Sequence, residues 1–222
     1  QEHQRQVTNH TGSYCIMKEL TDIREGWVWP KDDVRCWRCF QRQYNLPQSI
    51  IRHVENKKVC IQAGGNTGVY VKQFADVFET VYTFEPETVN FYCLTENLKN
   101  CNNVETLNSF LGQQNQKPTN IIRYDTKKDP NTGKFKIGED AGTIPVIAID
   151  TLNLRSCDLI QLDIEGGEYN ALLGAVETIK EFKPVICLEW FENQEKLFNL
   201  LTSLNYKEID NLQSDRIFAY QH

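Results

Sequence analysis

Short apolar runs alternate with amphipathic stretches from about residue 59 onward. Val59–Gln62 is an apolar run that ends in a glycine turn, and Val69–Ala75 after it has helical spacing. Further strands are predicted at Val81–Phe84 and Val104–Leu107, on either side of a helix over Phe91–Leu98. This strand–helix rhythm predicts parallel strands joined by right-handed crossovers.

A polar, turn-rich segment then interrupts the rhythm between Gln113 and Thr143, and it is too long for an ordinary connection. Within it, IIRY and KFKI flank DPNTG, a pattern that predicts a β-hairpin insertion around residues 113–143. Apolar runs resume at Ile144–Ile149 and Leu159–Leu162, and a helix is predicted through Leu172 and Val176.

The C-terminal part continues with a strand at Pro184–Leu188 and an amphipathic helix from about Glu195 to Leu204. Two strands follow, Tyr206–Ile209 and Arg216–Tyr220, separated only by DNLQSD. Strands joined by so short a loop must run antiparallel, because a parallel return needs a crossover. The sequence therefore predicts a Rossmann-like α/β fold. Its twisted, mostly parallel sheet has seven strands, with an antiparallel last strand and helices on both faces.

Residues 1–57 have a different character, and we expect them to form a helical or irregular extension packed on a domain of residues 58–222. A short helix is predicted near Pro47, because Ile50, Ile51 and Val54 fall on one face. Three tryptophans lie in WVWPKDD and CWRC. They could form a platform for a sugar, but such residues more often anchor a segment, and we favour anchoring.

The turn in KVCIQAGGNTGVYV holds Gly64, Gly65 and Gly68 between a strand and a helix. Glycines let the backbone approach a ligand closely. The second strand ends at Glu85, where an acid can bind the ribose hydroxyls of a nucleoside cofactor. Neither G-x-G-x-x-G nor the Walker pattern with its lysine is present here. The pattern thus favours a cofactor that carries a nucleoside and an amino acid but no phosphate.

Carboxylates gather at the predicted carboxyl edge of the sheet. Asp163 ends the fourth strand, Glu189 ends the fifth, and Glu165 and Glu168 lie between them. Such a cluster can supply a general base, a group that orients a hydroxyl, or oxygen ligands for Mg²⁺. We favour a catalytic role for Asp163 and regard Mg²⁺ as the less favoured use. For Glu168, stabilisation of a helix N-terminus is an equal alternative.

Several segments resemble the FkbM-type methyltransferases, a branch of the class I fold that uses S-adenosylmethionine. They are QAGGNTG, FEPETVNFYCLTENL, IDTLN, CDLIQLDIEGGEYNALLGA and KPVICLEW. The resemblance runs from about Val59 to Tyr220, and it implies S-adenosylmethionine as methyl donor and S-adenosylhomocysteine as product. It assigns the methionine portion to Gly64, Gly65, Asn66 and Gly68, the ribose to Glu85, and the adenine to Asn108 and Ser109.

Two residues depart from the family pattern. Gln62 stands where the family has an acid, and Gln161 stands where it has a lysine. Gln62 remains a candidate cofactor ligand, because an amide can accept a hydrogen bond from the cofactor's ammonium group. It lacks the charge that strengthens such a bond.

Composition limits the partners. The 222 residues carry a net charge of −6, which disfavours nucleic acid, and no apolar run of membrane-spanning length occurs. The first residues lack the apolar core of a signal peptide, and the opening Gln1 suggests a processed start. Eight cysteines without a disulfide pattern indicate a cytoplasmic protein. Cys36 and Cys39 form one C-x-x-C pair, for which unpaired thiols are favoured over zinc.

These observations predict an O-methyltransferase that acts on a sugar, glycan or other hydroxylated metabolite, with the substrate class taken from the resemblance. Two alternatives stay open. One is a methyltransferase-like binding module that has lost activity, which Gln62 and Gln161 would favour. The other is a nucleotide-sugar or NAD enzyme on a related fold, which the missing third glycine disfavours. The pattern does not address the oligomeric state.

Overall fold

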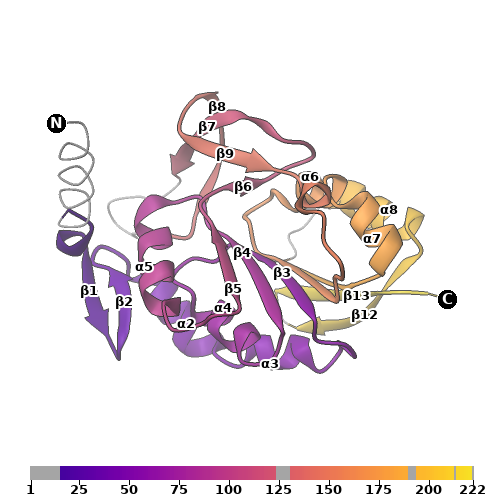
Figure 1. Ribbon diagram of the computed structural model, residues 1–222, viewed down its shortest axis with the longest axis horizontal. Coiled ribbons are helices and arrows are strands. Elements are labelled where there is room, and N and C mark those ends of the chain that lie inside the picture. The colour runs from indigo at the N-terminus through magenta and orange to yellow at the C-terminus, as the bar shows by residue number, and fades with distance from the viewer. Residues whose placement is uncertain (1–15, 124–130, 190–193, 213, 222) are drawn as a thin grey trace.

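The computed structural model describes residues 16–123, 131–189, 194–212 and 214–221. Their main feature is a seven-stranded sheet in the order β12-β13-β11-β10-β3-β4-β5 (Figure 1). Its strands are β3 (Val59–Ala63), β4 (Thr80–Phe84), β5 (Val104–Leu107), β10 (Leu159–Leu162), β11 (Val185–Glu189), β12 (Tyr206–Leu212) and β13 (Asp215–Tyr220).

The predicted strand directions are confirmed. Strands β5, β4, β3, β10 and β11 pair in parallel, and β13 pairs antiparallel with both β11 and β12. The last strand therefore inserts between β11 and β12. The hairpin is tighter than expected, because β12 extends through Leu212 and β13 begins at Asp215, so the two strands together take up most of the predicted loop.

Side chains from successive strand residues pack on opposite faces of this sheet. Cys60, Leu159 and Cys187 belong to one apolar cluster, while their neighbours Ile61 and Ile160 belong to another. Helices α3 (Leu46–Ile51), α4 (Val69–Ala75) and α5 (Thr88–Leu98) pack in the first cluster, and α6 (Glu168–Leu173), α7 (Val176–Phe182) and α8 (Glu195–Ser203) pack in the second. Helices therefore cover both faces, as the pattern predicted.

The helix predicted through Leu172 and Val176 is two helices, so that prediction was wrong in detail. Gly174 follows α6, and a β-carbon there would lie 2.0 Å from the carbonyl oxygen of Gly112. Asp150, in the 3₁₀ turn η1 (Ile149–Leu152), accepts hydrogen bonds from the backbone N–H groups of Glu177 and Thr178. A new N-terminal cap directly after a close backbone contact explains the break.

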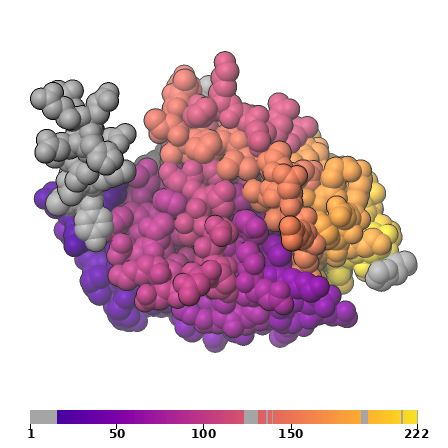
Figure 2. Space-filling view, in the orientation of Figure 1, coloured from indigo at the N-terminus to yellow at the C-terminus, as the bar shows by residue number. Residues whose placement is uncertain are grey.

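The insertion builds a second sheet with the strand order β6-β9-β7-β8. Its strands are β6 (Phe110–Leu111), β7 (Gln116–Arg123), β8 (Phe135–Ala141) and β9 (Ile144–Ile147). Strands β7 and β8 pair antiparallel, as IIRY and KFKI predicted, although Asp129 and Pro130 of the predicted DPNTG turn lie outside the described residues. The run at Ile144 belongs to this sheet, which stands above the carboxyl edge of the main one (Figures 1 and 2).

The N-terminal segment is more ordered than the expected helical or irregular extension. It contains a hairpin of β1 (Thr21–Arg24) and β2 (Trp27–Pro30), followed by α2 (Arg35–Gln43). The hairpin turn is Glu25–Gly26, and both residues have positive φ, as a two-residue turn requires. Strand β2 packs beside α5 (Figure 1), where both polar groups of the Asn97 side chain bind the backbone of Val28.

Candidate functional site

The glycine turn begins where β3 ends and lies against the end of β10. A β-carbon on Gly64, whose φ is +82°, would lie 1.9 Å from the carbonyl oxygen of Asp163. A β-carbon on Gly65 would meet Leu94 and Thr83 within 2.6 Å. Gly68, with φ +88°, begins α4 in a left-handed conformation. The turn therefore needs glycine for both close approach and backbone conformation.

Glu85 follows β4 and is bound to the glycine turn. One carboxylate oxygen accepts the N–H of Asn66 and the other accepts the N–H of Glu87, both at 2.8 Å. The residue is 2% exposed. Burial raises its pKa to about 8, although the two backbone hydrogen bonds act in the opposite direction. Glu85 thus fixes the shape of the turn in addition to facing the cavity described next.

A cavity of about 390 Å³ opens above the ends of β3, β4 and β10. Among its lining residues are Gly64, Glu85, Ser109, Asp163, Phe135 and Ile137. The hydroxyl of Ser109 is buried and has no hydrogen-bond partner among the described residues. A buried polar atom that faces a cavity without a partner is what a ligand-binding site requires, since such a group is costly to leave unpaired.

Asn108, Gln62 and Gln161 do not line either of the two cavities described here. The Asn108 amide donates to the carbonyl oxygens of Glu85 and Pro86, so it holds the loop after β4. Gln62 is buried between strands, where it accepts from the Thr83 hydroxyl at 2.6 Å and donates to the carbonyl of Ala63. Gln161 is buried as well. These amides lie beneath the site or support its walls.

Asp163 and Glu189 lie together at the ends of the neighbouring strands β10 and β11. Leu162 and Leu188, the residues before them, are register partners, and both acids line one cavity, described below. Burial, reinforced by the Asp163 charge, raises the pKa of Glu189 to about 10. Burial also raises the pKa of Asp163, while Glu189 and the charge of Lys134 act in the opposite direction. Glu189 is therefore protonated near neutral pH, which leaves Asp163 as the acid of the pair that can accept a proton.

The two other predicted acids have different surroundings. The Glu165 carboxylate lies 3.7 Å from the Lys134 ammonium, and the residue lines both cavities. The Glu168 carboxylate is buried and accepts the backbone N–H groups of Ile164 (3.1 Å) and Gly166 (3.3 Å). Glu168 thus holds the turn after β10, a structural role that differs from the predicted stabilisation of a helix N-terminus.

A second cavity, of about 260 Å³, lies on the other side of the glycine turn. Asp163, Glu165 and Glu189 line it, together with Asn66 and Tyr70. Helix α2 of the N-terminal segment forms its outer wall through Arg35, Cys36, Cys39, Phe40 and Gln43. Because Gly64, Glu85, Gly133, Asp163 and Glu165 line both cavities, the two spaces meet beside Asp163 and Glu165, whereas Glu189 lines the second cavity alone.

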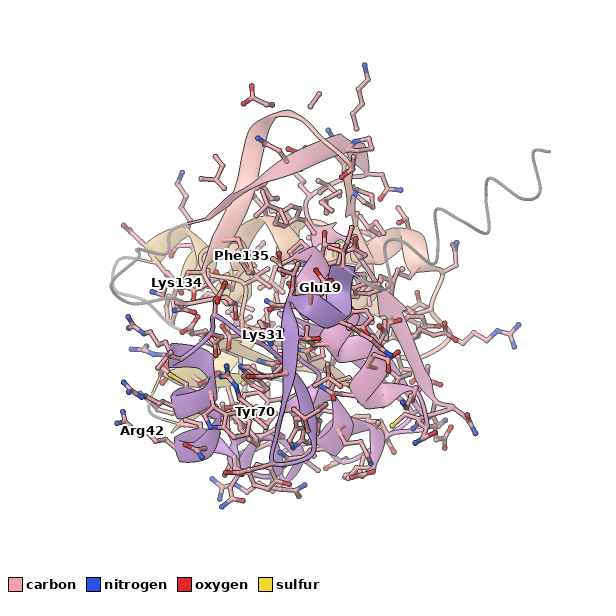
Figure 3. All side chains as sticks on the ribbon, turned by 90° about the vertical axis from the view of Figure 1, so that its left-hand side faces the viewer. Glu19, Lys31, Arg42, Tyr70, Lys134 and Phe135 are labelled. Atoms are coloured by element: carbon pink, nitrogen blue, oxygen red, sulfur yellow. The ribbon has the colours of Figure 1, made fainter. Side chains whose placement is uncertain are left out.

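The sequence patterns missed the residues that the insertion and the N-terminal segment bring to the site. Lys134 lines the second cavity, and Phe135 and Ile137 line the first. Figure 3 labels Lys134 and Phe135 side by side in the chain. The alternation of β8 sets this arrangement, but no local signal indicates that the hairpin folds over the sheet edge. Arg35 is the first residue of α2, and the acidic residues Asp32 and Asp33 precede it. Charged residues in this arrangement are typical of any exposed helix, so they did not indicate a site.

Cysteines and metal ligands add no further site among the described residues. Cys36 and Cys39 are free thiols, and burial raises the pKa of Cys36 to about 12. No group of three or more His, Cys, Asp or Glu side chains is arranged to hold a metal ion within the described ranges. The helices of the same ranges are all too short or too polar to cross a lipid bilayer.

Solved structures of methyltransferases have a similar fold. Methyltransferase FkbM from Methylobacillus flagellatus aligns with 18% identity and a TM-score of 0.50, over 74% of this chain and 44% of that protein. The chain therefore spans less than half the length of that relative. The TYW2 structure from M. jannaschii in complex with AdoMet aligns with 13% identity and a TM-score of 0.43, over 90% of this chain and 86% of the other.

No curated protein sequence matches the chain significantly. The match to a family model is direct: residues 62–214 fit the methyltransferase FkbM domain, which covers the glycine turn, Glu85 and the acidic pair. This region is more than half of the 222 residues. It agrees with the resemblance carried by QAGGNTG and LDIEGGEYNALLGA, and the chain belongs to the FkbM methyltransferase family.

Proposed function

We propose that the protein transfers a methyl group from S-adenosylmethionine to a hydroxyl group of a sugar, glycan or other hydroxylated metabolite. The neighbouring carboxyl groups of Asp163 and Glu189, at the ends of two paired strands, are the observation that carries this proposal. Both acids line the second cavity beside the glycine turn, and Asp163 lines the first cavity as well. Asp163 would be the ionised acid of the pair and would accept the proton of an acceptor hydroxyl.

The residues around the first cavity fit the adenosine part of the cofactor. Ser109 offers an unpartnered hydroxyl at one end, and Glu85 lies at the end of the adjacent strand. Phe110 and Phe135 supply apolar walls suited to a planar base. The amino-acid part would extend past Gly64 toward the second cavity. S-adenosylmethionine, when bound, supplies a methyl group on a positively charged sulfur.

Asp163 is the proposed general base. The protonated Glu189 carboxyl would donate a hydrogen bond to Asp163 and so orient the ionised carboxylate, while Lys134 favours its negative charge. Asp163 would accept the hydroxyl proton as the acceptor oxygen bonds to the methyl carbon and the carbon–sulfur bond breaks. A positioned base contributes about 10²- to 10⁴-fold to the rate, and alignment of the reactants supplies much of the rest.

The test is transfer of a labelled methyl group from S-adenosylmethionine to a panel of hydroxylated acceptors. With the acceptor found, Asp163→Asn should lower kcat by about 10²-fold or more, with cofactor affinity little changed. Asn has the size of Asp but cannot take up the proton. Unchanged turnover in this variant would refute the role of Asp163. Cofactor binding without transfer to any hydroxylated acceptor would favour the binding-module alternative.

A further inference from the structure

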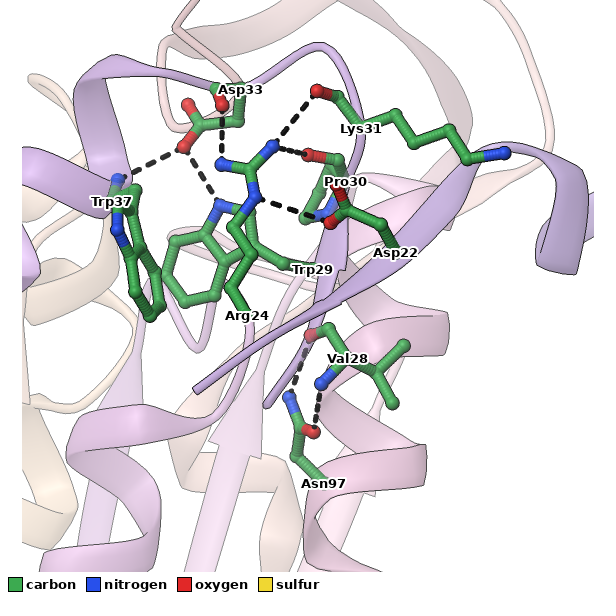
Figure 4. Close-up of polar contacts among 9 residues, drawn as sticks. All are labelled: Asp22, Arg24, Val28, Trp29, Pro30, Lys31, Asp33, Trp37 and Asn97. Atoms are coloured by element: carbon green, nitrogen blue, oxygen red, sulfur yellow. Dashed lines mark hydrogen bonds and ion pairs between the residues drawn. The ribbon is translucent and has the colours of Figure 1, made fainter. Parts of the chain in front are cut away.

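The N-terminal segment is fixed to the domain by a buried carboxylate, Asp33. This side chain accepts hydrogen bonds from the Trp29 indole (2.8 Å) and the backbone N–H group of Trp37 (3.0 Å), as Figure 4 shows. It also accepts the backbone N–H group of Cys36 (3.2 Å). Arg24 binds the backbone carbonyl of Asp33 from the other side. Asp33 is 0% exposed, so the first turn of α2 is held in one position.

Helix α2 also contacts the glycine turn and the helix that follows it. The Cys36 thiol lies 3.7 Å from the Asn66 amide nitrogen. At the other end of α2, the Tyr70 hydroxyl donates to the carbonyl of Gln43 at 3.2 Å. The Asn97 amide bridges the carbonyls of Val28 and Thr67. Helix α2 is therefore a fixed wall beside the turn.

Helix α2 contributes a basic side chain, Arg35, to the second cavity, which several acidic side chains line. Arg35 and Lys134 are the two basic side chains among the lining residues of the second cavity. Lys134 pairs with Glu165 and lowers the pKa of Asp163, so its charge balances the acids. Arg35 comes from α2 and lines the same cavity. Arg38 and Arg42 lie on the same helix but do not line the cavity, and Arg42 points away from the body of the molecule (Figure 3).

We infer that Arg35 binds the carboxylate of the amino-acid part of S-adenosylmethionine. The inference rests on the proposed function, which places this part beyond Gly64 and in the second cavity. A carboxylate there would meet Asp163 and Glu165, whose negative charges would repel it unless a cation faces it. A guanidinium group matches a carboxylate with two parallel hydrogen bonds. The segment outside the matched domain thus completes the cofactor site.

The experiment compares S-adenosylmethionine with decarboxylated S-adenosylmethionine, which keeps the adenosine, the sulfonium and the ammonium and lacks only the carboxylate. Calorimetry would measure both affinities for the wild type, Arg35→Ala and the control Arg38→Ala. Arg35→Ala should weaken S-adenosylmethionine by about 10- to 100-fold and leave the analogue unchanged within about twofold. Arg38→Ala should change neither affinity, and Arg35→Lys should keep part of the preference.

Equal losses for both ligands in Arg35→Ala would overturn the inference, because they would indicate a distorted cavity. If Arg35→Ala kept the wild-type preference for S-adenosylmethionine over the decarboxylated analogue, the inference would also be overturned. The proposed function would stand in that case, because the wild type still binds S-adenosylmethionine. A wild type that binds neither ligand would refute the proposed function and the inference together. Thermal unfolding of each variant verifies that Arg35→Ala remains folded.

Discussion

Replacement of Glu189 by Gln tests the electrostatics of the acidic pair without knowledge of the acceptor. In the folded protein the pKa of Glu189 is raised from its ordinary 4.5 to about 10, first by burial and then by Asp163. Between these values the folded state keeps a proton that the unfolded state releases. The contribution of Glu189 to the free energy of unfolding is therefore complete at pH values below its ordinary pKa, and it is lost as the pH rises toward about 10.

The magnitude follows from the same shift. Each pH unit inside the interval lowers the free energy of unfolding by up to about 1.4 kcal/mol. The loss between about pH 6 and about pH 8 is therefore up to about 3 kcal/mol, or roughly half of that because Glu189 is partly exposed to solvent. Gln cannot ionise, yet its amide can still donate to Asp163. Glu189→Gln should therefore lack this part of the pH dependence.

Urea unfolding of wild type and Glu189→Gln at both pH values measures the difference. We expect the variant to gain about 1–3 kcal/mol relative to wild type on going from about pH 6 to about pH 8. Asp215, whose burial raises its pKa to about 7, is present in both proteins and so contributes to both curves. The same change in the free energy of unfolding with pH in wild type and Glu189→Gln would refute the assignment of the proton to Glu189.

Two further predictions concern the turns that form the site. Gly64→Ala should cost about 3 kcal/mol or more or prevent folding, because its β-carbon would meet the carbonyl of Asp163. Gly166→Ala is the control: its φ is also positive, but nothing lies within 4 Å of the added carbon, so about 1 kcal/mol is expected. Glu168→Ala should lower stability by about 2–4 kcal/mol, since two backbone N–H groups lose their acceptor. The control is Glu177→Ala, which changes an exposed residue and should cost less than about 0.5 kcal/mol. Equal losses of stability in the Glu168→Ala and Glu177→Ala variants would contradict the role of Glu168.

The main sheet could be predicted from the sequence because its signals are local. Runs such as Val104–Leu107 and Leu159–Leu162 match the observed strands residue for residue. The short loop after β12 was enough to give the direction of the last strand. The break at Gly174 was missed, because it depends on the carbonyl of Gly112, more than sixty residues earlier in the chain. Contacts between distant segments leave no periodic pattern.

The candidate site, like the fold, could be predicted where local signals determine it and not where it depends on contacts between distant segments. Gly64, Glu85 and Asp163 could be placed together because parallel strands end at one edge of a sheet. The roles of side chains were harder to predict. Gln62 was expected to face the cofactor, but Thr83 on the neighbouring strand binds its side chain beneath the turn. Lys134 and Arg35 reach the site only because the insertion and α2 fold back over the sheet edge.

Titration of wild-type protein with S-adenosylhomocysteine, followed by calorimetry and repeated with NAD, tests the central claim most directly. The cavities beside the glycine turn predict one S-adenosylhomocysteine bound per chain and no heat of binding with NAD. Binding of NAD alone would favour the dinucleotide alternative. Absence of S-adenosylhomocysteine binding would contradict the proposal that this site uses S-adenosylmethionine.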